Sequence, residues 1–337
     1  METTRARGAG REDAAVPVPL RIAPTPHDVR HLRTEQHRSG HDLADDTHPP
    51  VVGRPQGPDE EPPMSVIPFP LRGPDIEVPA APDPTVTDVT GLGTVLGVWA
   101  HPDDEAFLAG GLMAAARDAG QRVVCVTATL GEHGTADPFA WPPDRMARVR
   151  RHELDASMAV LGVDEHHTLG ITDGTCAAQP HDALVRHLGR VIDIVAPDTI
   201  VTFGPDGLTG HEDHQTVSSW VTAARAAVAP RTRLLYVTTT DEFVDGWEPA
   251  RDAFDVFLAD GLPLRTPESA LAVQLRLDDA TLDRKVVALR AQASQMTGLI
   301  AAVGEERARQ WWSVEAFVSA DAVAGSARTW GTWRVAA

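Results

Sequence analysis

Short apolar runs alternate with helical patterns between residues 94 and 240, and this alternation constrains the fold more than any other feature of the sequence. The apolar runs have the length of buried strands and lie at 94–100, 122–129, 166–170, 198–204 and 233–240. The segments between them carry apolar residues at helical spacing and lie at 105–120, 144–162, 181–197 and 214–230. Strands that alternate with helices form a mostly parallel sheet with helices on both faces. The sequence therefore predicts a Rossmann-like α/β domain.

The two ends of the chain are less regular. After about residue 241 we expect one further strand at 271–277 and a helix at 279–296. Residues 1–90 are rich in Pro, Asp, Arg and His and lack apolar periodicity, so they cannot bury enough surface to offset the entropy of ordering. The sequence therefore predicts a disordered tail over 1–90 and a single domain over 91–337.

Charge and cysteine content argue against several classes of protein. The formal net charge is -18, whereas a nucleic-acid binder needs a basic face to displace counterions, so no nucleic-acid partner is expected. Cys125 and Cys176 form no CxxC pair, which gives no support to a disulfide framework or a thiolate zinc site. Apolar runs of membrane-spanning length and a signal-peptide pattern are both missing from the sequence. We therefore expect a cytoplasmic protein without membrane insertion, and the oligomeric state stays open.

The first polar motif, AHPDDE at Ala100–Glu105, lies where a predicted buried strand ends and a helix begins. Three acids follow His101 within four residues. Acids at a helix N-terminus can be simple caps, and this remains the alternative for Asp103 or Asp104. Capping does not explain why a histidine also stands at the end of the strand.

The second polar motif, GPDGLTGHEDHQTV at Gly204–Val217, also follows a predicted buried strand and opens a helix. His211 and His214 are three residues apart, so they face the same side of a helical turn, and imidazole pairs at this spacing can bind a metal. Ligands bind at the carboxyl ends of strands in sheets of this kind. We therefore expect the two motifs to meet in one site.

Together, Ala100–Glu105 and Gly210–His214 resemble the motifs of the LmbE-like (PIG-L) N-deacetylase family. The similarity runs from about Gly93 to about Val318 and includes segments 127–135, 150–163, 169–175 and 282–295. Members of this family remove acetyl groups from N-acetylglucosamine conjugates, or cleave related amides, using zinc. The resemblance implies that 91–337 is such a hydrolase domain, acting on a small-molecule N-acyl amino sugar or a related conjugate. Zinc is the implied cofactor, with another divalent metal as the alternative.

The resemblance also implies a set of metal ligands, namely His101, Asp104 and His214. These residue types suit the chemistry, because two neutral imidazoles and one carboxylate leave an open coordination position, as a catalytic zinc site requires. A metal held in this way polarises the amide carbonyl and lowers the pKa of water.

Five further residues match functional positions of the family. The resemblance implies that Asp103 is the general base and that His211 stabilises the oxyanion and protonates the leaving amine. It implies that Asp213 orients His211, and a carboxylate bonded to that ring would favour its protonated form. Arg150 and Asp173 match positions that hold the sugar.

The chain departs from the family pattern at three places. Thr209 stands where the mycothiol branch carries Tyr, Glu212 where Pro is usual between the histidines, and Gln292–Gln295 where the family often has HxSQ or HxTQ. These changes remove neither a proposed ligand nor the proposed base, but they leave the substrate open. A mycothiol-conjugate amidase of the same fold and a non-catalytic metal-binding α/β protein remain alternatives. A nucleotide-binding domain is disfavoured, because the turn after 94–100 lacks the glycines it needs.

Other polar residues have weaker signals. Glu132 and His133 follow the second predicted strand and either face the site or belong to a surface loop. His166 and His167 begin a short strand and are not expected to be ligands. Lys285, on the predicted C-terminal helix, is expected to be structural.

Overall fold

The computed structural model describes residues 89–247, 256–259 and 261–325. The tail predicted over 1–90 lies outside these residues except for its last two positions. The described residues form a seven-stranded sheet in the order β3-β2-β1-β4-β5-β7-β6. The strands are β1 (Val95–Trp99), β2 (Val123–Thr127), β3 (Glu165–Thr168), β4 (Thr199–Phe203), β5 (Arg233–Thr238), β6 (Val273–Arg276) and β7 (Val314–Ser319). The prediction of a mostly parallel α/β sheet is confirmed.

Two kinds of pairing divide the sheet. From β3 to β5 all neighbouring strands are parallel, with β1 between β2 and β4. β7 then pairs antiparallel with both β5 and β6. The central strands β1, β2 and β4 are buried along their whole length, which is why they read as continuous apolar runs in the sequence.

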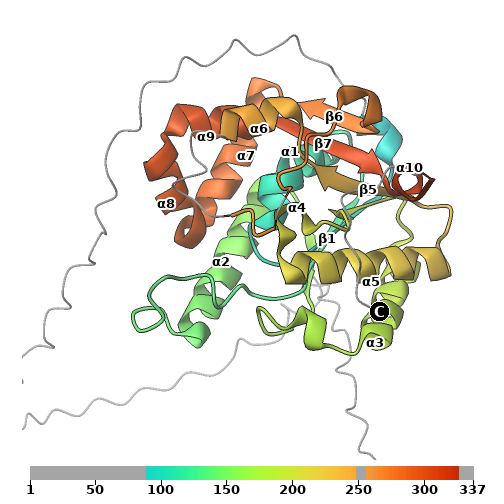
Figure 1. The fold of residues 1–337 in the computed structure, drawn as a ribbon, viewed down its shortest axis with the longest axis horizontal. Coiled ribbons are helices and arrows are strands. Elements are labelled where there is room, and N and C mark those ends of the chain that lie inside the picture. The colour runs from blue at the N-terminus through green and yellow to red at the C-terminus, as the bar shows by residue number, and fades with distance from the viewer. Residues whose placement is uncertain (1–88, 248–255, 260, 326–337) are drawn as a thin grey trace, which may run out of the picture. The chain divides into compact units, whose positions relative to one another are not determined.

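Helices cover both faces of this sheet. Their bounds are α1 (Asp104–Asp118), α2 (Pro143–Leu161), α3 (His181–Val195), α4 (Gly207–Gly210), α5 (Glu212–Val228), α6 (Asp241–Trp247), α7 (Asp279–Ala291), α8 (Ala293–Val303), α9 (Glu305–Trp311) and α10 (Ala320–Gly325). Short 3-10 helices lie at Val89–Leu92, Cys176–Ala178 and Glu268–Ala270. α3 packs against α5, and α7 packs against α1 and α2, as Figure 1 shows. Each β-α unit thus buries an apolar helix face on the sheet.

The helix predicted at 279–296 differs from the structure, which has two helices, α7 and α8, bent by 116°. The break falls at Gln292, whose backbone is not helical and whose buried side chain donates a 2.6 Å hydrogen bond to Glu105. This long-range bond fixes Gln292 where a helical pattern alone would continue. Among the described residues, no single helix is long and apolar enough to span a membrane; α7 and α8 meet that criterion only as a bent pair.

Candidate functional site

The two polar motifs meet at the carboxyl ends of β1 and β4, as the sequence predicts. His101 lies in the turn between β1 and α1, and His214 lies in the first turn of α5. Their rings face each other, with His101 Nδ1 3.1 Å from His214 Nε2. The loop after β3 brings Asp173 to the opposite side of the His101 ring, 3.1 Å from Nε2. The site is therefore built from segments that are far apart in the sequence.

The side chains of three residues, His101, Asp104 and His214, converge in a triangle. Asp104 Oδ2 lies 3.6 Å from His101 Nδ1, and Asp104 Oδ1 lies 3.5 Å from His214 Nε2. Ligands about 2.0–2.1 Å from a tetrahedral zinc ion are about 3.3–3.4 Å apart. The separations of 3.1, 3.5 and 3.6 Å, the last two to the two different oxygens of Asp104, are close to this spacing.

The partners of the other ring nitrogens determine what the two imidazoles offer. His214 Nδ1 lies 3.0 Å from the Gly207 carbonyl, to which it must donate, so its Nε2 presents a lone pair. His101 Nε2 faces the carboxylates of Asp173 and Asp213, so it too donates and its Nδ1 presents a lone pair. Two lone pairs 3.1 Å apart repel unless a cation or a proton lies between them. The donor set therefore fits a divalent metal.

Two other groups of residues also have ligand atoms within 4.8 Å of one another. One joins His211 to His101 and His214, and the other joins Asp173 and Asp213 to His101. The second group surrounds Nε2 of His101, the side that acts as hydrogen-bond donor. Asp104 approaches both His101 Nδ1 and His214 Nε2 within 3.6 Å. The group with Asp104 therefore lies on the Nδ1 side of His101, where the ring presents the lone pair that an ion needs.

Electrostatics favour the protonation states that metal binding needs at two of the three residues. Burial lowers the pKa of His214 to about 4, which keeps this imidazole neutral at pH 7. Burial would raise the pKa of Asp104, but His214 and His101 outweigh it and bring the pKa to about 2. Burial likewise opposes protonation of His101, yet hydrogen bonds to Asp104, Asp173 and Asp213 raise its pKa well above 6.5. The surrounding carboxylates thus favour a positive charge at the His101 ring, either a proton or a metal ion bound to it.

Asp103 has a strained backbone and an unusual carboxyl group. Its φ of 98° is a conformation that a residue with a Cβ rarely adopts, at a cost of about 1–3 kcal/mol. Its side chain makes no capping hydrogen bond to α1, so the alternative that it is a simple helix cap is not supported. Burial raises its pKa to about 7, although the Arg150 guanidinium 3.1 Å away opposes the rise. Such a carboxyl group is matched to proton transfer near neutral pH.

Arg150 braces Asp103 and the neighbouring turns. Its guanidinium donates to the carbonyls of Gly131 and Pro102 and to the Asp103 carboxylate, and the side chain is only 4% exposed. A Cβ on Gly131, whose φ is +61°, would lie 2.0 Å from this guanidinium, so the turn after β2 requires glycine. The described hydrogen bonds of Arg150 all go to protein atoms. Gly131 is thus a positioning residue that the sequence motifs did not identify. The sequence feature that could have identified it is a glycine just after a buried strand.

The loop residues Glu132 and His133 hold Asp173. Glu132 Oε1 accepts a 3.1 Å hydrogen bond from the Asp173 backbone N–H, and the His133 N–H donates to Asp173 Oδ2 at 3.0 Å. The pair therefore belongs to the site's support and is not simply exposed loop. Lys285, expected to be structural, is buried and paired with Glu315 at 2.6 Å.

Asp213 has a different partner from the one expected. Its carboxylate accepts hydrogen bonds from the backbone N–H groups of Gly174 and Cys176 and lies 3.3 Å from His101 Nε2. Its contact with His211 is made by its backbone N–H, which donates to Nδ1 at 3.2 Å. The expectation that the carboxylate orients His211 is corrected, because His211 caps α5 and turns that ring nitrogen toward the helix. Burial and His101 also lower the pKa of His211, so the expected protonated form is not favoured.

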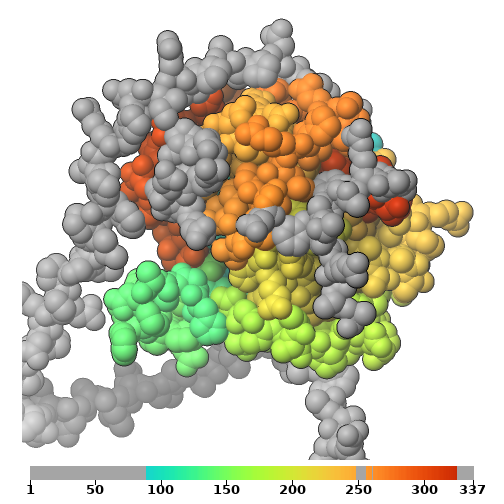
Figure 2. Space-filling view, in the orientation of Figure 1, coloured from blue at the N-terminus to red at the C-terminus, as the bar shows by residue number. Residues whose placement is uncertain are grey.

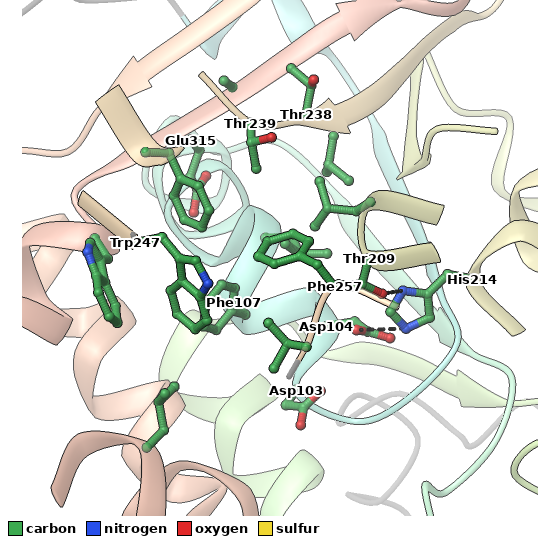
Figure 3. A pocket seen from close by; sticks show the side chains of 18 of the residues that line it. Asp103, Asp104, Phe107, Thr209, His214, Thr238, Thr239, Trp247, Phe257 and Glu315 are labelled. Atoms are coloured by element: carbon green, nitrogen blue, oxygen red, sulfur yellow. Dashed lines mark hydrogen bonds and ion pairs between the residues drawn. The ribbon is translucent and has the colours of Figure 1, made fainter. Parts of the chain in front are cut away.

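A cavity of about 400 Å³ opens beside Asp103, Asp104 and His214 (Figure 3). Thr209 lies at its edge, with Oγ1 3.4 Å from His214 Nδ1. The Leu258 N–H donates to the Thr209 carbonyl at 2.7 Å, which holds the segment 256–259 at this edge. Figure 2 shows the orange residues of the C-terminal part lying against the yellow residues that precede them in the chain. The far wall is formed by β5, β7 and the helices α6, α8 and α9.

Comparison with known proteins places this geometry in context. The family model described as PIG-L, GlcNAc-PI de-N-acetylase, matches residues 96–225. The chain is 31% identical over 248 residues to a 1D-myo-inositol 2-acetamido-2-deoxy-alpha-D-glucopyranoside deacetylase of Corynebacterium diphtheriae, covering 62% of this chain and 78% of the relative. A protein of the same name from Actinosynnema mirum is 34% identical over 233 residues, covering 60% and 81%. The fold is similar to that of N,N'-diacetylchitobiose deacetylase from Pyrococcus horikoshii, with 20% identity, a TM-score of 0.50, and coverage of 68% and 84%.

Proposed function

The chain belongs to the PIG-L (LmbE-like) deacetylase family, and from this premise we propose that it is a metal-dependent hydrolase of N-acyl amino sugars. The reaction is removal of an N-acyl group, acetyl in the simplest case, from an N-acetylglucosamine-type conjugate. The observation that carries the proposal is the triangle of His101 Nδ1, His214 Nε2 and the Asp104 carboxylate beside a strained, half-buried Asp103. Binding alone requires neither that strain nor a carboxyl group of raised pKa.

Zinc is the proposed cofactor, held by His101, Asp104 and His214. Two imidazole nitrogens and one carboxylate oxygen are ligands that zinc accepts, and they leave a coordination position open. When bound, the ion supplies Lewis acidity, which polarises the scissile carbonyl and lowers the pKa of water. Asp173 and Asp213 accept the Nε2 proton of His101 and so keep Nδ1 directed at the ion.

Asp103 is the proposed general base. It lines the cavity beside Asp104 and His214, where a substrate amide would lie. A carboxylate with a pKa of about 7 is basic enough to take a proton from the attacking water at neutral pH. Arg150 holds the carboxylate in place through its 3.1 Å contact, and the backbone strain directs the side chain into the site instead of along α1.

His211 is the proposed donor to the oxygen that becomes negative during the reaction. Its Nδ1 accepts the Asp213 N–H, so a neutral ring carries its proton on Nε2 and can donate there. Such a donor is worth about 2.7–4 kcal/mol of transition-state stabilisation. Arg150 and Asp173 are the proposed sugar-binding positions.

The substrate class rests on the relatives, whose names describe deacetylation of a glucosaminyl inositol. We propose a small-molecule conjugate of this chemistry and a cytoplasmic location for the enzyme. An amidase of the same fold acting on mycothiol conjugates is the second candidate, favoured by one observation. The space next to the proposed metal ligands continues into a cavity larger than an acetyl group needs.

An amine-release assay tests the proposal. Purified protein is stripped with a chelator, reloaded with zinc and incubated with N-acetylglucosamine and its inositol conjugate. Release of glucosamine amine by the reloaded protein, at least 100-fold above the stripped protein, is the expected result. Equal release with and without metal, or release from neither substrate while zinc binds at one ion per chain, would overturn the proposal.

A further inference from the structure

The cavity beside the site has a polar end and an apolar end. The polar end is formed by Asp103, Asp104 and His214. The remaining described lining residues are mostly apolar and include Phe107, Phe243, Trp247, Phe257, Leu299 and Trp311. Pockets of this size and polarity hold small molecules with an apolar body and a few fixed polar contacts.

The polar side chains deep in the cavity are already satisfied. Thr238 and Thr266 share a 2.6 Å hydrogen bond, and the Thr239 hydroxyl donates to the Leu264 carbonyl. The Glu315 carboxylate is paired with Lys285 at 2.6 Å and accepts two backbone N–H groups of α1. Each of these groups already makes a hydrogen bond within the protein, so this end of the cavity offers few partners to a sugar hydroxyl, and burying a hydroxyl without a partner is costly.

Aromatic side chains concentrate around this cavity although aromatic residues make up only 5% of the sequence. The ring of Trp247 lies 4.7 Å from that of Trp311 and 6.0 Å from that of Phe257. Figure 3 shows Trp247 and Phe107 on the side of the cavity away from His214, with Phe257 between them and His214. The Trp311 indole N–H donates to the Gly246 carbonyl, so this ring presents carbon to the cavity.

The position of the cavity indicates which half of a substrate enters it. Asp173, a proposed sugar-binding residue, lies on the Nε2 side of His101, whereas the cavity begins at Asp104 and His214 on the Nδ1 side. Neither Asp173 nor Arg150 is among the described residues that line it. An amide held at the proposed metal site would then have its amino sugar on one side and its acyl group on the other, facing the apolar walls.

We propose that this cavity binds an apolar acyl chain longer than acetyl, so that the enzyme acts on long-chain N-acyl amino sugars. The proposal rests on the proposed function, because it assigns one side of that site to the acyl half of the scissile amide. Each additional buried methylene should increase the binding constant about fourfold, because moving one methylene out of water is favourable by about 0.8 kcal/mol. A chain of eight carbons has six methylenes more than acetyl.

A substrate series tests the proposal on the zinc-loaded, full-length protein. N-octanoylglucosamine should have a kcat/KM at least 100-fold higher than N-acetylglucosamine. Octyl N-acetylglucosaminide, which carries the same chain on the sugar's other side, should show less than a tenfold gain. Equal kcat/KM for the octanoyl and acetyl substrates would overturn the proposal, and so would a larger gain for the octyl glycoside.

Cavity-filling variants connect the effect to these walls. Gly298→Leu and Ala316→Leu place extra volume in the lining from two different elements, α8 and β7, and a Cβ at Gly298 meets nothing within 4 Å. Each should lower the ratio of octanoyl to acetyl kcat/KM at least tenfold. Ala301→Leu, at an exposed position of α8 outside the described lining, is the matched control and should leave the ratio unchanged. An unchanged ratio in both cavity variants would contradict the assignment.

A binding measurement separates the failure of this proposal from failure of the proposed function. Calorimetry with the Asp103→Asn protein and N-octanoylglucosamine should show binding at least 100-fold tighter than N-acetylglucosamine, with a negative heat-capacity change. If amine is released from none of the substrates but this difference in binding persists, the proposed function fails and the acyl cavity stands. If N-octanoylglucosamine binds no tighter than N-acetylglucosamine, the acyl cavity fails whatever the activity.

Discussion

The parallel and antiparallel parts of the sheet contribute different things to the site. The segments that follow β1 and β4 carry every group to which we assign a chemical step or a metal contact, and the loops after β2 and β3 support them. The antiparallel strand β7, with α6, α8 and α9, supplies most of the apolar cavity wall. The proposed chemistry thus lies at the ends of the parallel strands, whereas the C-terminal elements shape the proposed substrate cavity. The two parts should respond differently to mutation.

One buried ion pair joins the two parts. Glu315 on β7 accepts hydrogen bonds from the Gly111 and Leu112 N–H groups of α1 and pairs with Lys285 of α7. Burial lowers the pKa of Lys285, because removing the ammonium group from water disfavours its charge. The Glu315 carboxylate offsets part of this desolvation cost. This pair stabilises the interface without touching the proposed metal ligands.

The largest effect is expected from the proposed ligands in the parallel part. His101→Ala, Asp104→Ala and His214→Ala should each weaken zinc affinity by more than the roughly 10–100-fold that outer-shell substitutions cost, and abolish turnover. Metal analysis after dialysis measures this directly. Glu212→Ala, which removes an exposed carboxylate beside His211, is the control and should retain one ion per chain. Full metal content in all three ligand variants would refute the ligand set.

The buried pair should affect stability and not metal binding. Lys285→Met leaves the Glu315 charge buried without its cation, and should lower the free energy of unfolding by about 3–5 kcal/mol. Adding Glu315→Gln should recover part of that loss, because it removes the unpaired charge while the amide carbonyl still accepts one of the two α1 N–H groups. Urea unfolding of the single and double variants measures the coupling. A loss below about 1 kcal/mol in Lys285→Met, or loss of zinc at unchanged stability, would contradict this division of roles.

A smaller effect is expected at Asp213, where the structure corrects the sequence-based role. Because its carboxylate faces His101 Nε2, Asp213→Ala should weaken zinc affinity about 10–100-fold. A competing chelator titration compares it with His211→Ala, which should bind zinc normally and lose turnover. If Asp213→Ala keeps full zinc affinity and only slows turnover, its role lies with His211 after all.

The sequence predicts the elements whose structure depends on neighbouring residues better than those that depend on long-range contacts. The strands β1, β2 and β4 are buried throughout, so their apolar composition was sufficient to predict them. β7 was missed, because its antiparallel pairing with β5 and β6 depends on contacts outside any β-α repeat. The Asp213 carboxylate contacts His101, which is 112 residues away in the sequence. The sequence motifs instead paired Asp213 with His211, which is only two residues away. Local motifs therefore predicted the proposed ligands and base, and long-range packing determined their partners.

The smallest effect is expected from removal of the N-terminal segment. Deleting residues 1–63 should leave the unfolding midpoint, zinc content and turnover unchanged, because this segment lacks the apolar content to form a core. Thermal unfolding and amine release on the truncated and full-length proteins provide the comparison. Loss of zinc or of turnover on truncation would show that the segment contributes to the proposed site or to its support.

The central claim is that Asp103 moves a proton while its neighbour Asp104 holds the metal, and Asp103→Asn tests it most directly. Asn adopts positive φ more readily than most residues, so the turn should keep its backbone, but the amide cannot accept the proton. Zinc content and amine release are measured on the same samples. The account predicts one zinc per chain with turnover reduced by about 10²-fold or more. Loss of zinc, or turnover close to that of the unmodified protein, would contradict it.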